Sequence, residues 1–102
     1  MSIKKKLKIG IVGSTGSVGK TSLNIISKYP KDFKVELLVC DKNYRAIILQ
    51  IKKFAPKYVF INNVKSFNLV QNKIKNKKII ILNDYKKFQK ILNLKFDKII
   101  LA

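Results

Sequence analysis

Short runs of apolar residues alternate along this chain with longer segments in which apolar residues recur every three or four positions. The short runs have the length of buried β-strands, and they cover residues 7–12, 34–40, 58–61, 79–82 and 98–101. The longer segments have the period of amphipathic helices, and they cover residues 20–29, 44–54, 64–74 and the stretch that follows Asp84. The pattern therefore predicts the element order β-α-β-α-β-α-β-α-β.

The spacing of the apolar residues also predicts which side chains each helix buries. They are Leu23 and Ile26, with Ile25 as a further candidate, in the first helix; Ile47, Ile48, Ile51 and Phe54 in the second; Phe67, Val70 and Ile74 in the third; and Tyr85, Phe88, Ile91 and Leu92 in the fourth. Pro30 and Pro56 end the first two helical stretches, because a residue that precedes proline disfavours helical backbone angles. The carboxylate of Asp84 suits the N-cap of the fourth helix.

Strict alternation of strands and helices is typical of an α/β fold in which helices cover both faces of a parallel sheet. Right-handed crossovers make this a doubly wound parallel sheet, a Rossmann-like half, for which we predict the strand order 3-2-1-4-5. A chain of 102 residues forms one domain at most. Since the loops that form sites in such sheets follow the strand ends, we expect residues 1–102 to be a truncated N-terminal dinucleotide-binding domain. The catalytic and C-terminal domains would then lie outside this chain.

The large positive net charge does not change the predicted fold class or the expected type of ligand. The formal net charge is +18, and 22 of the 23 basic residues are lysine, beside 16 isoleucines and 9 asparagines. All three residue types have A/T-rich codons, and the lysines are spread along the chain without arginine–aromatic interleaving. We therefore interpret the charge as compositional bias and expect no nucleic-acid partner. A basic nucleic-acid-binding module is the alternative, and it predicts steeply salt-dependent binding.

Other bulk properties point to a globular protein of the cytoplasm. The hydrophobic content is 47%, which argues against disorder. No apolar stretch is long enough to span a bilayer, so we expect no membrane partner. The basic start of the chain resembles a signal peptide, but it runs directly into a glycine turn and lacks a cleavage-like site, so we expect a cytoplasmic protein. Cys40 is the only cysteine, so an intrachain disulfide is excluded.

A glycine-rich turn joins the first predicted strand to the first helix, and such a turn presents backbone N–H groups to phosphate. Its glycines, Gly13, Gly16 and Gly19, are spaced by three. In a dinucleotide turn they would form the tight turn, let the backbone approach the diphosphate, and let the helix pack closely on the strand. A nucleoside-triphosphate P-loop needs four residues before Gly-Lys-Thr, but here five separate Gly13 from Gly19. The P-loop alternative would give roles to Lys20 and to Asp41 as a Mg²⁺ ligand.

Two conflicting signals follow the second strand, where the adenosine ribose of a dinucleotide would lie. Asp41 stands about 20 residues beyond the turn, where a carboxylate accepts from the ribose 2′-hydroxyl and selects NAD. Lys42 and Asn43 come directly after it and suit a 2′-phosphate, which selects NADP. If Asp41 points away, Lys42 and Asn43 can still form the phosphate site. Cys40 is interpreted as a small buried residue.

Several segments resemble the 1-deoxy-D-xylulose 5-phosphate reductoisomerase family. The segments are Gly-Ser-Thr-Gly-Ser-Val-Gly at 13–19, Thr-Ser-Leu-Asn-Ile-Ile at 21–26, the second strand with Lys42-Asn43, and Phe-Ala-Pro-Lys-Tyr-Val at 54–59. The resemblance covers the first two-thirds of the chain by residue and the rest by pattern. One departure is Asp41, where the family has glycine. Aspartate-semialdehyde-type dehydrogenases have a related turn with alanine in place of Ser14 or Ser17.

The resemblance implies an NADPH-dependent enzyme that uses Mg²⁺ or Mn²⁺ and converts 1-deoxy-D-xylulose 5-phosphate to 2-C-methyl-D-erythritol 4-phosphate in non-mevalonate isoprenoid biosynthesis. It implies diphosphate contacts at Thr15, Gly16, Ser17 and Val18, and 2′-phosphate contacts at Lys42 and Asn43. The family's catalytic and metal-binding residues lie downstream, so none is expected in this chain. The expected partners are the cofactor, a sugar-phosphate substrate and, in the full-length protein, a second copy. Another NAD(P)-dependent dehydrogenase is the alternative.

Overall fold

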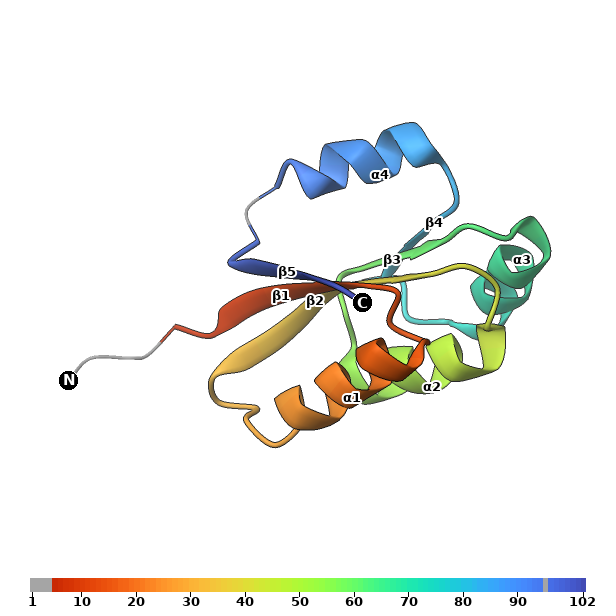
Figure 1. Ribbon diagram of the computed structural model, residues 1–102. Coiled ribbons are helices and arrows are strands. Elements are labelled where there is room, and N and C mark those ends of the chain that lie inside the picture. The colour runs from red at the N-terminus through yellow and green to blue at the C-terminus, as the bar shows by residue number, and fades with distance from the viewer. Residues whose placement is uncertain (1–4, 95) are drawn as a thin grey trace.

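The computed structural model describes residues 5–94 and 96–102. Its elements follow the predicted alternation, and they are β1 (Leu7–Val12), α1 (Ser17–Ile26), β2 (Phe33–Cys40), α2 (Tyr44–Phe54), β3 (Tyr58–Ile61), α3 (Val64–Lys73), β4 (Ile80–Leu82), α4 (Tyr85–Leu92) and β5 (Lys98–Leu101). All the strand pairs are parallel, and helices lie on both sides of the sheet (Figure 1). The predicted fold class, a doubly wound parallel α/β sheet, is confirmed.

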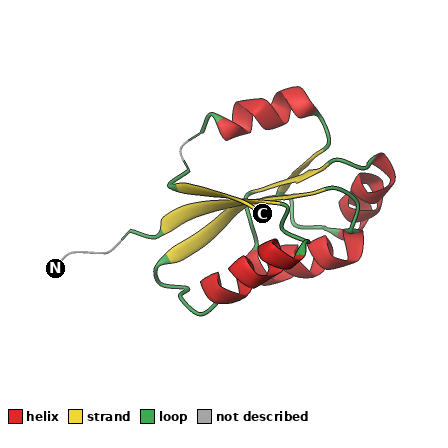
Figure 2. Ribbon diagram, in the orientation of Figure 1, coloured by secondary structure: helices red, strands yellow, loops and turns green. Residues whose placement is uncertain are grey.

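The strand order is β4-β3-β2-β1-β5, so the predicted order 3-2-1-4-5 is wrong. The fourth strand continues outward beside β3, and the fifth returns to β1. When successive strands are added in one direction across the sheet, right-handed crossovers place their connecting helices on the same face. When the direction reverses, the next helix lies on the other face. Accordingly α1, α2 and α3 cover one face, and α4 alone crosses the opposite face (Figure 2). Asn83 Nδ2 fastens the end of β4 by donating to Ile61 O at 2.8 Å and to Asn62 O at 2.9 Å.

The core is divided by the sheet into two clusters. On the face covered by α1, α2 and α3, here called the three-helix face, the buried residues are Ile9, Ile11, Leu23, Ile26, Val35, Leu38, Cys40, Ile47, Ile51, Val59, Ile61 and Val70. On the single-helix face, under α4, they are Leu37, Val39, Phe60 and Phe88. Burial on both faces explains why the strands read as continuous apolar runs.

The helical periodicity predicted most of the buried positions, but it placed both ends of α1 three residues too late. Leu23 and Ile26 are buried as predicted, whereas Ile25 is 53% exposed and Tyr85, also predicted to be buried, is 63% exposed. Helix α1 begins at Ser17, three residues before the predicted position, and Gly16 caps it without a side-chain hydrogen bond. Asp84 caps α4 as predicted, since its Oδ1 accepts from Lys86 N at 2.9 Å. Helix α1 also ends at Ile26, three residues before the predicted end at Tyr29, whereas the other predicted boundaries differ from the structure by one residue at most.

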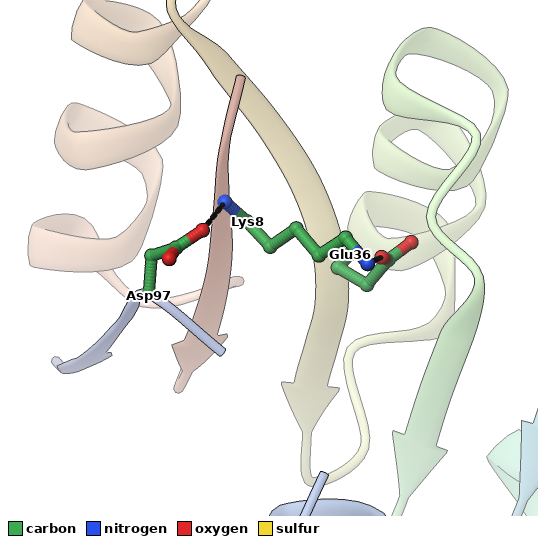
Figure 3. A network of polar contacts seen from close by, with 3 residues as sticks. All are labelled: Lys8, Glu36 and Asp97. Atoms are coloured by element: carbon green, nitrogen blue, oxygen red, sulfur yellow. Dashed lines mark hydrogen bonds and ion pairs between the residues drawn. The ribbon is translucent and has the colours of Figure 1, made fainter. Parts of the chain in front are cut away.

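A polar network at the amino end of the sheet ties three distant segments together (Figure 3). Lys8 N donates to Asp97 Oδ2 at 2.6 Å, and Asp97 N donates to Lys8 O at 2.9 Å. Lys8 Nζ lies 3.7 Å from Glu36 Oε2, whose side chain is largely buried. Glu36 is the extra residue of a bulge, because Ile9 pairs with Val35 and Gly10 with Leu37. The entry to β5 is therefore fixed to β1 at the edge opposite the glycine turn.

Candidate functional site

The glycine turn lies at the carboxyl end of β1, between β2 on one side and β5 on the other. Gly13 N and Ser14 N both donate to Val39 O, at 2.9 and 3.0 Å, and Ala102 N donates to Val12 O at 2.9 Å. The strand order changes direction at β1, since β2 leads outward and β5 follows the return crossover through α4. The turn therefore occupies the switch point at which open α/β sheets bind ligands.

Each glycine of the turn has a different environment. Gly13 has φ +86°, a left-handed conformation that side chains disfavour, and an added Cβ would lie 2.8 Å from Ala102 O. A Cβ on Gly19 would lie 2.7 Å from Ser14 Cα, so the start of α1 packs directly against the turn. Gly16 is open by contrast, because the nearest atom to an added Cβ is Gly13 O at 3.6 Å. Its exposed backbone leaves room for a group that approaches from solvent.

Several backbone N–H groups at this turn have no protein acceptor. Gly16 N donates to Gly13 O at 3.2 Å, and Lys20 N donates to Gly16 O at 2.9 Å. Among the described residues, the N–H groups of Thr15, Ser17 and Val18 donate to no acceptor. Unpaired N–H groups at the start of a helix carry partial positive charge and attract anions. The residues predicted for the diphosphate are thus brought together, with three N–H donors available.

Lys20 does not take the position that the P-loop alternative requires. It lies at the end of the first turn of α1, where its own N–H is already bonded to Gly16 O. Together with Leu23 and Leu49, it lines a groove of about 180 Å³ between α1 and α2. This groove lies on the three-helix face, so the geometry favours the dinucleotide interpretation of the turn.

Asp41, the residue with the conflicting signal, is held toward β3. Its Oδ1 accepts from Asn62 Nδ2 at 3.0 Å, and its carbonyl accepts from Asn63 N at 2.9 Å. Asn62 follows β3, the neighbour of β2 on the side away from β1 and the glycine turn. The carboxylate is therefore engaged on the outer side of the loop.

Lys42 and Asn43 form the loop that leads from β2 into α2. Asn43 caps α2, since its Oδ1 accepts from Ala46 N at 3.2 Å, and this leaves its Nδ2 group to donate elsewhere. Lys42 O accepts from Ser66 Oγ at 2.7 Å and from Tyr44 N at 2.8 Å. The backbone of the loop is thus fixed while the Lys42 side chain remains exposed. A fixed loop with an amide and an ammonium donor suits a phosphate.

Two supporting residues were missed from the sequence. Ser66 is 5% exposed at the start of α3 and holds the Lys42 carbonyl. Gln50 on α2 donates from Nε2 to Ser14 O at 2.8 Å and so contacts the glycine turn. Both lie on the inward face of an amphipathic helix, one turn from Val70 and from Ile47 respectively. An isolated polar residue at a buried helical position is the signal that would have found them.

Cys40 lies buried at the end of β2, immediately before this loop. Burial and, secondarily, the Asp41 carboxylate raise the pKa of its thiol from the ordinary value of 9.0 to about 12. The thiol is therefore protonated at neutral pH and acts as a small core residue, as the sequence predicted. Within the described residues, no group of three or more His, Cys, Asp or Glu side chains is placed to hold a metal ion.

The sheet order, the two helical layers and the glycine turn define a Rossmann-like α/β domain. The family model described as 1-deoxy-D-xylulose 5-phosphate reductoisomerase matches residues 9–102. The chain belongs to this family.

Individual relatives agree with the family match. The reductoisomerase of Pelagibacter ubique (strain HTCC1062) is 42% identical over 86 residues, which cover 84% of this chain and 22% of the relative. The enzyme of Sulfurihydrogenibium sp. (strain YO3AOP1) is 46% identical over 68 residues, which cover 67% of this chain and 18% of the relative. The chain thus spans about a fifth of the length of the curated relatives that it matches.

Solved structures with the same fold include two reductoisomerases. The Zymomonas mobilis enzyme in complex with NADPH aligns with a TM-score of 0.70 at 18% identity, covering 76% of this chain and 20% of that chain. A reductoisomerase with fosmidomycin and magnesium aligns with a TM-score of 0.78 at 20% identity, covering 91% of this chain and 24% of that chain. At this level of identity the likeness establishes the fold.

In the part of the chain that the structure describes, no helix is long and apolar enough to cross a membrane.

Proposed function

We propose that residues 1–102 are the NADPH-binding portion of a reductoisomerase that converts 1-deoxy-D-xylulose 5-phosphate to 2-C-methyl-D-erythritol 4-phosphate. The observation that carries this proposal is the group of unpaired N–H donors at Thr15, Ser17 and Val18, which lie at the switch point of the sheet. Bound NADPH would supply the hydride for the reduction. The diphosphate would lie against residues 15–18, and the open face of Gly16 would allow its close approach.

The 2′-phosphate of NADPH is assigned to Lys42 and Asn43. The Lys42 ammonium is exposed, and the Asn43 amide has a free donor beside the N-terminus of α2. Arg45 adds a second cation in the first turn of α2, with its guanidinium 5.7 Å from the centre of the Tyr44 ring. A cation near a helix N-terminus is unfavourable alone and becomes favourable when an anion binds there. The hydrogen bond from Asn62 Nδ2 to Asp41 Oδ1, on the side of the loop away from the glycine turn, supports NADPH over NAD.

The remaining properties are proposed for the longer protein from the family to which the chain belongs. Mg²⁺ or Mn²⁺ would be bound by residues outside 1–102, as the family resemblance implies. The sugar-phosphate substrate would contact the same outside region, and the complete protein would be a homodimer in the cytoplasm. Residues 1–102 would form its N-terminal domain, with small molecules as ligands and neither nucleic acid nor membrane as a partner.

Binding of NADPH and NADH by the purified chain tests the proposal. We expect NADPH to bind more tightly than NADH. We expect Lys42→Ala to raise the Kd for NADPH about 10- to 100-fold, which corresponds to the loss of one charge-assisted contact. The same change should leave NADH unaffected. Lys90→Ala is the matched control, because Lys90 is an exposed lysine on α4, on the opposite face. Absent or equal binding of the two cofactors to a folded sample would contradict the proposal.

A further inference from the structure

Gln50 makes a contact that standard helix packing does not require. Its side-chain amide reaches from α2 to the glycine turn, where Nε2 donates to the Ser14 carbonyl at 2.8 Å. Ser14 is fully buried, and its N–H is already bonded to Val39 O at 3.0 Å. Both backbone polar groups of Ser14 are therefore held, one by β2 and the other by α2.

The contact controls the orientation of the next peptide group. In a trans peptide the carbonyl and the following N–H point in opposite directions. None of the peptide bonds in the described residues is cis. When Gln50 draws the Ser14 carbonyl toward α2, the Thr15 N–H must point away from α2. Thr15 N–H is one of the donors that has no acceptor among the described residues.

Two buried polar atoms at the same junction support a role beyond packing. Ser14 Oγ and Gln50 Oε1 are both buried, and neither has a hydrogen-bond partner among the described residues. A buried polar atom without a partner destabilises the folded state, and an apolar side chain at either position would avoid that penalty. The amide of Gln50 is therefore explained by the single bond that it makes, from Nε2 to the backbone carbonyl of Ser14, and Ser14 Oγ takes no part in this bond.

We propose that Gln50 is a positioning residue for cofactor binding: it fixes the peptide between Ser14 and Thr15 so that the Thr15 N–H faces the diphosphate. Without the amide donor, this peptide can rotate and present the Ser14 carbonyl oxygen to the anion, which repels it. The inference rests on the proposed function, because it names how one donor of that same site is held. Gln50 itself makes no contact with the cofactor.

The first test compares two ligands on the variant Gln50→Leu. We expect the Kd for NADPH to rise about 10- to 100-fold, because one hydrogen bond to a charged group is lost. The Kd for adenosine 2′-monophosphate should stay unchanged, because this probe has no diphosphate and occupies only the Lys42–Asn43 loop. Gln71→Leu is the matched control, since Gln71 is an exposed glutamine on α3. Equal weakening of both ligands, or of neither, overturns the proposal.

The second test uses Gln50→Glu and keeps the inference falsifiable if the leucine variant does not fold. A glutamate carboxylate has no donor for the Ser14 carbonyl, whereas a protonated carboxyl group has one. We expect the Kd of this variant for NADPH, divided by that of the parent at the same pH, to be larger at pH 8 than at pH 5. A ratio that does not depend on pH overturns the proposal, because a merely structural defect would not be restored by protonation.

A third readout separates failure of this inference from failure of the proposed function. If the parent chain binds neither NADPH nor adenosine 2′-monophosphate, the proposed function is wrong. Inorganic pyrophosphate then serves as the probe, and its binding is monitored through the NMR amide resonance of Thr15. A shift in the parent that Gln50→Leu or Gln50→Glu abolishes at pH 8 supports the inference. An equal shift in the parent and the variants, or no shift in the parent, overturns it.

Discussion

The two faces of the sheet differ in how they are covered, and the candidate site depends mainly on one of them. Three helices pack on one face and bury twelve residues with it, whereas α4 alone packs on the other. Gln50 and Ser66, which brace the two loops of the site, both come from the three-helix face. On the single-helix face, Ile99 and Leu101 of β5 remain 39% and 80% exposed. The three-helix face thus combines the deeper core with the supports of the site.

The largest expected effect comes from two neighbouring leucines of β2 that are both fully buried. Leu38 points to the three-helix face and Leu37 to the single-helix face, each with 0% exposure. We expect Leu38→Ala to lower the free energy of unfolding by about 3–5 kcal/mol and Leu37→Ala by about 2–3 kcal/mol, because the thinner layer collapses more fully around a cavity. Urea unfolding measures both. An equal or larger loss for Leu37→Ala would show that α4 packs as firmly as the three opposite helices.

A smaller effect is expected at the start of α1, which belongs to the three-helix face. Gly19→Ala places a methyl group against the backbone of the turn, 2.7 Å from Ser14 Cα, and should cost about 1–3 kcal/mol of stability. Gly16→Ala is the matched control, because its Cβ meets only Gly13 O at 3.6 Å and should change stability by less than about 0.5 kcal/mol. Gly16→Ala should nevertheless weaken NADPH. Thermal unfolding measures the stability of both variants, and cofactor titration measures their affinity for NADPH. A loss of stability in Gly16→Ala as large as that in Gly19→Ala would contradict the prediction.

The helix caps offer a comparison of similar size on the two faces. Asp84 caps α4, and Asn63 caps α3 by accepting from Ser66 N at 3.0 Å. Replacing either with alanine should cost about 1 kcal/mol. Asn63→Ala should also weaken NADPH, because Ser66 holds the Lys42 carbonyl, whereas Asp84→Ala should not. If the two variants bind the cofactor equally, the support from α3 is not needed.

The smallest effect at neutral pH is expected from Cys40, on the three-helix face. Because the pKa of about 12 in the folded state lies above the ordinary 9.0, the protonated thiol stabilises the folded state below pH 9, and this contribution is lost as the pH rises toward 12. The free energy of unfolding should therefore fall more steeply with rising pH in the parent than in Cys40→Ala. The variant has the same lysines, so the comparison removes the contribution of lysine titration. At pH 7, thiol reagents should label Cys40 only after unfolding. Rapid labelling of the folded chain would contradict this burial.

The sequence alone was sufficient for the fold class, and it was insufficient for the strand order. Alternating periods identify each strand and helix, and the capping carboxylate of Asp84 marks the start of α4. Neither property states on which side of β3 the fourth strand lies. That position depends on tertiary contacts such as the Asn83 amide against Ile61 O and Asn62 O. The start of α1 was misplaced because Gly16 offers no side-chain cap to recognise.

The candidate site follows from the sequence in the same partial way. The residues at 15–18 and the Lys42–Asn43 loop follow from the glycine spacing and the family resemblance. The direction of the Asp41 carboxylate could not follow, because it depends on Asn62, which belongs to another strand. The role of Gln50 is likewise invisible in a periodic pattern, since it arises only when α2 packs beside the turn. The local chemistry of the loops could be predicted from the sequence, but the contacts between distant segments could not.

The pairing of β1 with β5 has a consequence for synthesis on the ribosome. Lys8 and Asp97 are separated by 89 positions, and β5 pairs with the side of β1 that β2 leaves open. A nascent chain therefore carries a central strand with one open edge until nearly all of these residues have emerged. Closing a contact of such long range is slow relative to local helix formation, and an open edge invites pairing with other chains. We expect this segment to need protection from aggregation until β5 has emerged.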